Sequence, residues 1–451
     1  MRRMKRMGAT CYYTAIPQPF LSPRFAMPSP MPPARDPAPA GRSSVSALRA
    51  AKTRMTPAER RATAGLSGIF GLRMLGMFIV LPVLALYAET LPGGRDHTLV
   101  GLALGAYGLT QAVLQIPFGY ASDRLGRKPV IIAGLIIFAL GSFVAAWAPD
   151  IGWTIAGRSL QGAGAISAAV LALTADLTRD EVRTRAMAAI GMTIGATFAA
   201  SLIAGPALTA VIGVPGIFVL TGALALGAIV VLRYAVPQPP APAARSDSAR
   251  QWRRVLGDRQ LLRLNYGIFA LHAALLALFV QVPFMLRDDG LPPAKHWLVY
   301  LPVLVASALL MWPALMQADR PTRGKPVFVG AVAVLLIGQL MLALAGGSLP
   351  MTVAALLVFF TAFNLLEATL PSLISKFAPP DIKGTASGVY SAVQFLGTFV
   401  GAFAGGWLSQ HHGPAAVFAF CIVLTALWLA ASTSMSAPPT YSNSAYSMGE
   451  I

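Results

Sequence analysis

The chain has 451 residues, of which 56% are hydrophobic and 12% are charged, and its formal net charge at pH 7 is +18. Soluble proteins carry about 25% charged residues, so this composition indicates an integral membrane protein and excludes an ordinary soluble domain. Two distant cysteines, Cys11 and Cys421, give no disulfide framework, and the histidines form no metal-binding spacing. We therefore expect no cofactor, no bound metal and no metal-dependent enzyme.

Residues 1–54 form a basic leader rich in proline, serine and alanine. Pro17, Pro19 and Pro23 interrupt the stretch after the basic start, so no apolar run of signal-peptide length follows. This composition is typical of a disordered tail, which buries too little apolar surface to fold. Translation starting at Met55 and a transit peptide are the two alternatives.

From residue 64 onward the sequence consists of apolar runs of roughly 20 residues, the length that a helix needs to cross about 30 Å of hydrocarbon. Backbone groups in lipid must be paired within their own segment, so these runs are predicted to be helices. Twelve are predicted, at 64–88, 98–121, 129–149, 151–175, 186–212, 215–236, 260–286, 297–317, 326–346, 350–375, 384–409 and 414–434. Residues 175–186 are expected to form a charged loop.

The chain divides into two halves of nearly equal length. Four residues recur with a single offset of 196: Pro117, Asp123, Arg124 and Arg127 correspond to Pro313, Asp319, Arg320 and Arg323. We therefore expect an all-α membrane protein with 12 transmembrane helices in two six-helix bundles related by a pseudo-two-fold axis. The bundles are residues 55–237 and 259–434, joined by a cytoplasmic linker at 238–258 and followed by a cytoplasmic tail at 435–451.

The basic residues are distributed unevenly between the two sides of the membrane. With the N-terminus in the cytoplasm, the tails and loops on that side hold 30 of the 35 Lys and Arg residues. This is the bias of the positive-inside rule, so both termini are predicted to be cytoplasmic. Topology accounts for the positive charge, and we expect no nucleic-acid partner.

Four ionisable residues lie inside the predicted membrane helices, more than one turn from either end: Arg73, Arg158, His272 and Glu367. Charge in lipid is costly, so each is a candidate functional residue. They lie on the first and fourth helices of each half. A repeat protein that binds its substrate near the midplane, between its halves, needs polar groups at such places.

Glu367 is the only acidic residue predicted to lie deep in a membrane helix. A carboxylate whose protonation depends on a movable cation, such as Arg73, can couple proton binding to a conformational change. A static Glu367–Arg73 pair and a direct contact with substrate are the alternatives. His272 is either a second proton site, because histidine titrates near neutral pH, or a neutral residue hydrogen-bonded to a neighbouring helix.

Arg158 is followed by the small residues Gly162 and Gly164, which allow helices to approach closely. It is either an aid to proton transfer or an interhelical hydrogen-bond anchor.

Gly205-Pro206 predicts a bend in the fifth helix, since proline removes a backbone hydrogen bond, with a passive kink as the alternative. The candidate residues for a substrate cavity are Arg73, Gln161, Gln281, Asn364 and Glu367.

The stretch Gly119–Pro129 combines one acid with three bases in a short turn between two membrane helices. Asp123 lies at a helix end, and Arg127 can reach Asp176 at the end of the fourth helix. An acid adds nothing to the positive-inside bias, so we interpret the stretch as more than a topology signal. The predicted conformational latch consists of Gly119, Asp123, Arg124, Gly126, Arg127 and Asp176.

These segments resemble the signatures of the major facilitator superfamily. Gly119–Pro129 resembles its loop between helices 2 and 3, Arg158–Gly164 its helix 4 signature, and Gly205-Pro206 its helix 5 antiporter motif. Further strings resemble the bacterial drug:proton antiporter branch, and one inner-membrane transporter within it: Met55–Thr63, Leu72–Phe78, Tyr107–Val113, Phe363–Glu367 and Pro371–Lys376. The resemblance covers about 55–434.

The resemblance implies alternating access by two rocking bundles, with helices 1, 4, 7 and 10 lining a central cavity. It also implies that Asp123 faces the start of helix 11 near Gly384, and that Asp123, Arg127 and Asp176 hold the outward-open state. Two departures matter. Ser201 and Ala207–Ala210 occupy positions at which the helix 5 motif of the family has glycines. Residues 435–451 are too short for the small C-terminal domain that the similar inner-membrane transporter carries.

We therefore expect a proton-coupled antiporter that exports small, amphipathic, drug-like molecules. It would work as a monomer in the bacterial inner membrane, with the proton gradient as its energy source. A proton symporter that imports a small solute is the alternative within transport. A polytopic membrane enzyme or receptor is a remote alternative, disfavoured because catalytic or metal-ligating residues are not clustered.

Overall fold

The computed structural model describes residues 55–238, 248–318, 320, 322–379 and 382–436. The leader at 1–54, part of the linker, Asp319 and most of the tail lie outside the described residues. The first group of helices comprises α2 (Pro57–Phe78), α3 (Leu81–Ala88), α4 (His97–Leu125), α5 (Arg127–Ala146), α6 (Ile151–Ala163), α7 (Ser167–Asp176) and α8 (Asp180–Tyr234).

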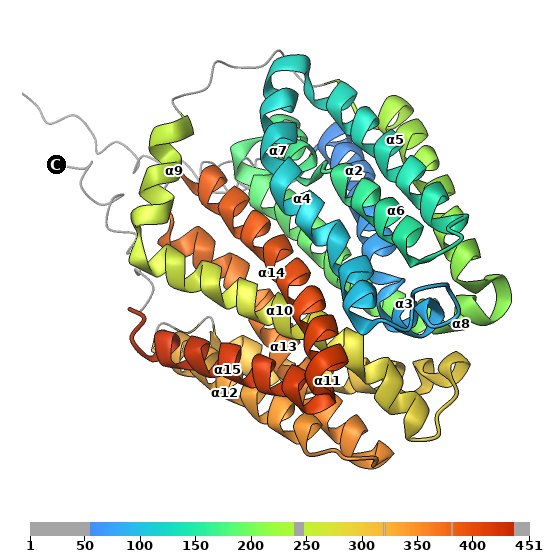
Figure 1. Cartoon of the computed structure of the whole chain (residues 1–451). Helices are drawn as coiled ribbons and strands as arrows, with labels where there is room; N and C mark the ends of the chain where they lie inside the picture. Colours follow the sequence, from blue (N-terminus) through green and yellow to red (C-terminus); the bar gives the residue numbers. More distant parts are fainter. Residues whose placement is uncertain (1–54, 239–247, 319, 321, 380–381, 437–451) are drawn as a thin grey trace, which may run out of the picture. The chain divides into compact units, whose positions relative to one another are not determined.

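The second group of helices follows the linker helix α9 (Ser248–Gly257). It comprises α10 (Arg259–Asp288), the short 3-10 helix η1 (Pro293–Lys295), α11 (Trp297–Ala318), α12 (Gly324–Ala343), α13 (Leu349–Phe377), α14 (Lys383–His412) and α15 (Pro414–Thr433). Figure 1 shows α2–α8 in blue to green and α10–α15 in yellow to red as two groups that meet along α4 and α14. The regular elements of the described residues are all helical, as predicted.

Within the described residues, ten helices are long and apolar enough to cross a membrane. The expected number was twelve, and two local features explain the difference. The fourth predicted helix is interrupted at Gly164–Ile166 between α6 and α7, so neither piece reaches spanning length. The fifth and sixth run together as α8, where Gly213 has non-helical angles with φ of 67°. The fold is thus consistent with twelve crossings.

The first predicted helix, 64–88, differs from the structure at its start and in its middle. α2 begins earlier, at Pro57, because Thr56 and Glu59 form a reciprocal capping box. The helix is then interrupted at Ile79 and Val80 before α3 begins. Pro82 has no N–H to donate to Phe78, so a continuous α-helix would lose a hydrogen bond here.

Two segments predicted as loop or linker contain helix instead. α8 starts at Asp180, so the expected loop at 175–186 is wrong for its second part. α9 lies inside the expected linker at 238–258, with Val255 buried against the second group of helices and Leu256 half exposed. Both errors have one cause. Apolar length locates the part of a helix that crosses lipid, while helices continue into water wherever their residues favour it.

The two groups of helices meet through glycines on α4. A Cβ atom on Gly101 would overlap the carbonyl oxygen of Ala402, and one on Gly108 would overlap the Thr398 hydroxyl. On its other side, α14 presents Gly397, Gly401 and Gly405 to the backbone of Phe269, Ala273 and Ala277 on α10. Such close backbone approach requires small residues at four-residue spacing. This four-residue spacing is present in the sequence of α14 and marks its contact with α10.

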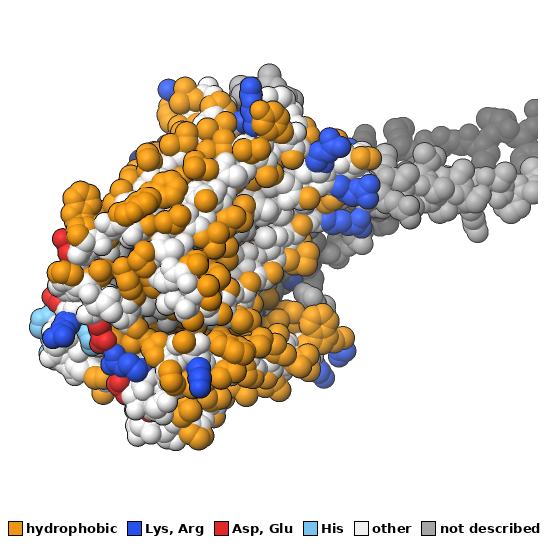
Figure 2. Space-filling model, turned by 90° about the vertical axis from the view of Figure 1, so that its right-hand side faces the viewer, with side chains coloured by type: hydrophobic (Ala, Val, Ile, Leu, Met, Phe, Trp, Pro, Cys, Tyr) orange, Lys and Arg blue, Asp and Glu red, His pale blue; other side chains and the backbone are white. Residues whose placement is uncertain are grey.

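The surface is apolar between two charged ends. Figure 2 shows hydrophobic side chains over most of the visible face, with Lys and Arg gathered at one end, and Asp, Glu and His together with some Lys and Arg at the other. Large apolar side chains such as Leu309 and Val211 are more than two-thirds exposed. Exposed apolar surface of this extent requires contact with lipid, so the chain is embedded in a membrane.

Candidate functional site

The molecule has two distinct ends, which we name by the predicted topology. The inner end carries Gly126 and the connection from α7 to α8. Among the described residues, the outer end carries six glycines with positive φ: Gly93, Gly213, Gly290, Gly346, Gly347 and Gly413. These names rest on the positive-inside prediction, whereas the contacts at each end are observed.

A polar cluster inside the second group of helices joins three of them. The amide Nε2 of Gln394 on α14 donates to Nε2 of His272 on α10 at 2.8 Å, and to Oε1 of Glu367 on α13 at 3.5 Å. The other imidazole nitrogen of His272, Nδ1, lies 3.3 Å from the carbonyl oxygen of Ile268, to which it donates. Gln394 thus bridges two titratable side chains, a role that the sequence did not reveal.

Glu367 keeps one carboxylate oxygen without a hydrogen-bond partner among the described residues. This atom, Oε2, is buried and lies 3.9 Å from His272 Nε2, while the glutamate side chain as a whole is 32% exposed. Buried carboxylates normally have all their oxygens satisfied. An oxygen left open beside an imidazole, on a side chain that solvent reaches, is suited to accept a proton.

Arg73 on α2 lies wholly within the first group of helices. Its guanidinium donates to the carbonyl oxygen of Gly164 at 3.2 Å, to the Ser167 hydroxyl at 2.8 Å and to Oε1 of Gln111. In the described part of the chain it forms no ion pair with Glu367. The static pair considered as an alternative is therefore absent from this conformation.

The interruption between α6 and α7 is stabilised by Arg73. Gly164 caps α6 and lies against the carbonyl oxygen of Gly134, where a Cβ atom would not fit. Its own carbonyl, released from helical bonding, accepts from the Ile166 N–H at 2.8 Å and from Arg73 at 3.2 Å. A broken membrane helix is tolerated where protein groups satisfy the freed backbone. The sequence predicted a continuous helix over 151–175 and gave no sign of this contact.

Arg158 on α6 is also fully buried in the first group of helices. It donates to Gln161 Oε1 at 2.8 Å and to the carbonyl oxygens of Gly76 and Ala103 at 3.4 Å. Its Nη2 and the hydroxyl of Tyr107 are buried without partners among the described residues. The guanidinium carbon of Arg158 lies 5.0 Å from the centroid of the Tyr107 ring, and that of Arg73 lies 5.7 Å from the same centroid.

The residues predicted to line a substrate cavity lie in separate places. Gln161 donates to Ser142 at 2.8 Å, Asn364 donates to Ser307 at 3.0 Å, and Gln281 accepts from Ser409 at 3.1 Å near the outer end. Neither of the two described pockets, of about 460 and 220 Å³, is lined by any of them or by Arg73 or Glu367. Their joint role in one cavity stays a prediction.

The predicted latch residues come together at the inner end. Arg127 on α5 donates to Asp176 at 3.0 Å, to the Ser122 hydroxyl at 2.8 Å and to Asp123. Gly126 has φ of 93° and caps both α4 and α5, which explains the glycine. Arg124 lies over the ring of Tyr120 at 4.3 Å, and Gly119 contacts Ala168 closely enough that a Cβ atom would touch it. The latch function itself stays a prediction.

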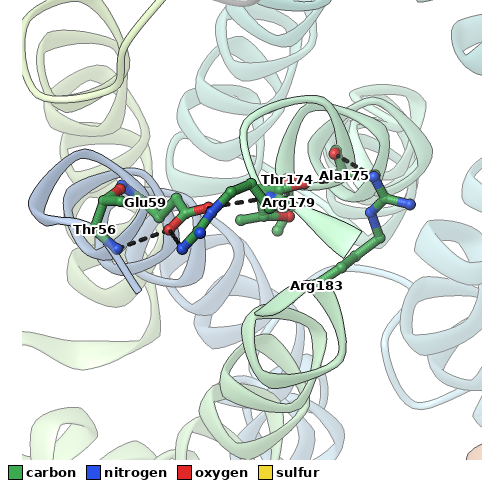
Figure 3. Close-up of polar contacts among 7 residues, drawn as sticks. Thr56, Glu59, Thr174, Ala175, Arg179 and Arg183 are labelled. Atoms are coloured by element: carbon green, nitrogen blue, oxygen red, sulfur yellow. Dashed lines mark hydrogen bonds and ion pairs between the residues drawn. The ribbon is translucent and has the colours of Figure 1, made fainter. Parts of the chain in front are cut away.

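A second ionic contact at the inner end was missed from the sequence. Figure 3 shows Arg179, before α8, reaching Glu59 in the first turn of α2, while Arg183 points away toward Ala175. Arg179 donates to both carboxylate oxygens through Nε at 2.8 Å and Nη2 at 3.1 Å. Hydrogen bonding to Arg179 lowers the pKa of Glu59, which precedes the apolar part of α2, to about 2. This bidentate contact fixes the start of α2 to the α7–α8 connection.

The outer end is closed by polar contacts between the two groups of helices. His97 at the start of α4 lies 2.8 Å from the Ser409 hydroxyl through Nδ1, and its backbone N–H donates to Gln410 at 2.9 Å. Arg287 at the end of α10 donates to Glu89 after α3 at 2.6 Å. Both side chains of this pair are about one-third exposed, so the ion pair is a modest contribution.

The inner parts of α8 and α14 have open space beside several glycines, and the contact here between α4 and α14 is the Gln115 amide, which donates to the Gly388 carbonyl oxygen at 3.4 Å. A Cβ atom on Gly191 or Gly195 of α8, or on Gly384 or Gly388 of α14, would meet no atom within 4 Å. Met192 is 70% exposed. The start of α14, which the latch is predicted to meet, therefore faces open space here. The structure is closed at its outer end and open toward its inner end.

Gly205 and Pro206 lie inside a helix that keeps helical angles through them, since the non-helical residue in α8 is Gly213. A Cβ atom on Gly205 would approach the carbonyl oxygen of Ile79, at the interruption between α2 and α3, to 2.5 Å. The glycine is thus explained by close helix packing, and a bend stays a prediction.

The described residues contain no group of three or more His, Cys, Asp or Glu able to hold a metal ion.

Comparison with known proteins identifies the same fold and motifs. The family model of the Major Facilitator Superfamily matches residues 66–402 and 296–445. The chain is 44% identical over 393 residues to the inner membrane transport protein YajR of Escherichia coli (strain K12), covering 86% of each protein. This agrees with the resemblance of its motifs to an inner-membrane transporter of this superfamily.

More distant relatives share the architecture. The chain is 25% identical over 348 residues to the multidrug resistance protein MdtH of Aeromonas hydrophila, covering 75% of this chain and 85% of the relative. Among solved structures, a bacterial homologue of the human lysosomal transporter Spinster, in an inward-facing and occupied conformation, superposes with a TM-score of 0.71 at 15% identity. That match covers 84% of this chain and 97% of the other, and it supports the fold alone.

Proposed function

The chain belongs to the Major Facilitator Superfamily and is a multi-pass membrane transporter rather than an enzyme, and from this premise we propose that it is a proton-coupled antiporter. Its substrates are small amphipathic molecules, which it exports by alternating access of its two groups of helices. The observation that carries the proposal is the cluster formed by His272, Gln394 and Glu367. No cofactor is required, because the proton gradient supplies the energy.

Glu367 has the chemistry that proton coupling needs. It is the only carboxylate in the interior of the described membrane helices, and its partners, Gln394 and the imidazole of His272, are not permanently charged. A charged carboxylate is costly to enclose in apolar surroundings, whereas a protonated one is not. Protonation therefore permits the two groups of helices to close around Glu367, and deprotonation favours the state that exposes it to water.

The two buried arginines act in the release of the proton rather than in its binding. Arg73 and Arg158 are bound to neutral acceptors, and their partners among the described residues include no carboxylate. When the groups of helices move together around the site, these cations favour the ionised form of any acid that approaches them. We propose that this opposes protonation of Glu367 in one state and thereby helps to release the proton.

Export is supported by the relative named for multidrug resistance, although its identity is low. Import by proton symport is the second candidate, favoured by Ser201 and Ala207–Ala210, which replace glycines of the helix 5 antiporter motif. In either case we place the protein in the bacterial inner membrane as a monomer, with both termini cytoplasmic. The segregation of basic side chains to one end supports this orientation.

The test uses the full chain in proteoliposomes that contain a pH-sensitive dye such as pyranine. A cationic and an anionic amphipathic dye, ethidium and carboxyfluorescein, are offered as probe substrates under an imposed pH gradient. We expect at least one probe to accumulate in an acidic lumen while the lumen turns alkaline. Accumulation with protons moving in the same direction would establish the symporter instead, and probe flux independent of the gradient would contradict proton coupling.

A further inference from the structure

A continuous chain of aromatic rings crosses the boundary between the two groups of helices. On one side, Phe198 of α8 contacts Phe78 of α2, with ring centroids 5.1 Å apart. Across the boundary, the Phe198 ring lies 5.9 Å from Phe363 and 6.3 Å from Phe360, both on α13. Phe198 is therefore an aromatic contact between α8 and α13, in addition to the packing of α8 on α11 and η1.

The same chain of rings ends at the proposed proton site. Phe363 lies 6.0 Å from the imidazole of His272 and four residues before Glu367 on α13, so it occupies the same helix face one turn away. Phe198 and Phe363 are 7% and 4% exposed. His272 thus contacts Phe363 on one side and approaches Glu367 on the other.

The rings lie on the outer side of the proton site. From Phe360 the chain continues to Phe279 at 6.5 Å and then to Tyr300 at 6.3 Å, both fully buried. Toward the inner end, by contrast, Ala368 is exposed next to Glu367, and Gly195 on α8 faces open space. The aromatic rings separate a site that is open to one end from the end that is closed.

We propose that Phe198 is a positioning residue for proton coupling, which seals the His272–Glu367 pair from the outer end. Its ring packs on Phe363 across the boundary, and by doing so it excludes water and keeps the two groups of helices joined outside the site. This inference rests on the proposed function for its role in coupling, whereas the joining of the helices by Phe198 does not depend on it. The small side chain of alanine at this position opens a route for water to Glu367.

The first experiment measures how often the outer end opens. Ala85 on α3 is fully buried at the outer end, where α3 meets α10, and a cysteine there reports opening to a water-soluble maleimide. The background carries Cys11→Ser and Cys421→Ala. Loss of an aromatic pair shifts an equilibrium by roughly two- to tenfold, so Phe198→Ala should speed labelling of Ala85→Cys by about that factor.

The second experiment measures proton leak without substrate in proteoliposomes. Phe198→Ala should show a leak that wild type lacks, and the added substitution Glu367→Gln should abolish it. Phe198→Trp should restore both wild-type behaviours. Phe143→Ala is the matched control, since Phe143 packs on Trp147 and Gly222 inside the first group of helices, and it should leave labelling and leak unchanged.

The outcomes separate the two claims. Unchanged labelling of folded Phe198→Ala protein overturns the joining role, and faster labelling without a leak overturns the seal. A leak of equal size in Phe143→Ala also overturns it, because any loosened core would then suffice. If wild type shows no proton-coupled flux while Phe198→Ala still speeds labelling, the proposed function fails and the joining role of Phe198 stands.

Discussion

Nε2 of His272 lies 3.9 Å from Oε2 of Glu367, and the amide of Gln394 donates to both side chains. Two titratable groups at this distance bind protons as a pair rather than independently. The pair lies within one group of helices, at the boundary with the other, on the side that is open in this conformation. Its placement makes proton binding sensitive to the movement that alternates access.

Replacing His272 by glutamine should change the pH dependence of transport without abolishing it. Glu367 keeps its contact with Gln394 in this variant, but only one group of the pair still titrates. The pH profile of probe transport should therefore become less steep than in wild type. The measurement is the initial rate of probe uptake between pH 5 and 9, at a fixed pH difference, and an unchanged profile would remove His272 from the coupling site.

Gly101→Ala should destabilise the closed outer end. The added Cβ would overlap the backbone of Ala402 on α14, so the helices must separate or strain. Overpacking of this kind costs about 1–3 kcal/mol, which shifts a conformational equilibrium by roughly 5- to 150-fold. Labelling of the Ala85→Cys reporter should rise within that range. Gly195→Ala is the control, because its Cβ would meet no atom within 4 Å; an equal rise there would show a general loosening instead.

Asp123→Asn should act in the opposite direction. If Asp123, Arg127 and Asp176 hold the outward-open state through the start of α14, losing one carboxylate removes part of that contact and favours the inward-open state. Labelling of Ala85→Cys should then slow down relative to wild type, and Asp176→Asn should give the same direction of change. Labelling at the wild-type rate in both variants would contradict the latch.

Glu59→Gln should make stability depend less on pH in acid. The folded pKa of Glu59 is lowered to about 2, below the value of about 4.3 for unfolded glutamate. The stabilisation by its charge is therefore complete above the unfolded value and is lost as the pH falls from about 4.5 toward 2. The thermal midpoints of wild type and Glu59→Gln should differ by a constant amount above about pH 5 and converge in stronger acid. The exposed Glu181→Gln serves as control, and a difference that persists at pH 2 would refute the assignment.

The helices that cross lipid could be predicted from the sequence because apolar length is a direct physical requirement of the bilayer. The start of α2 was missed although the capping box of Thr56 and Glu59 is a local signal. The start of α8 could not be predicted, since its N-cap residue Arg179 is held by Glu59 from a distant segment. The interruption at Gly164 was missed for a related reason. One of the two donors to the freed carbonyl is Arg73, 91 residues away, and the other is the nearby Ile166 N–H.

The candidate site was predicted residue by residue but not as an arrangement. The free-energy cost of placing charge in lipid identified Arg73, Arg158, His272 and Glu367 as candidates. The structure shows that these polar side chains are buried or partly buried. Their grouping depends on helix rotation, which placed Glu367 with His272 and Gln394 rather than with Arg73. The aromatic contact of Phe198 with Phe363 had no signal in the sequence, because buried phenylalanines are common in such a protein.

The most direct test of proton coupling measures proton and probe movement together in proteoliposomes containing wild type or Glu367→Gln. For wild type, adding the transported probe should change the lumenal pH in proportion to probe flux. For Glu367→Gln, we predict that the probe still binds, as judged by ligand-induced thermal stabilisation, while the pH change falls to that of empty liposomes. A variant that binds the probe and moves protons at the wild-type rate would contradict Glu367 as the coupling site.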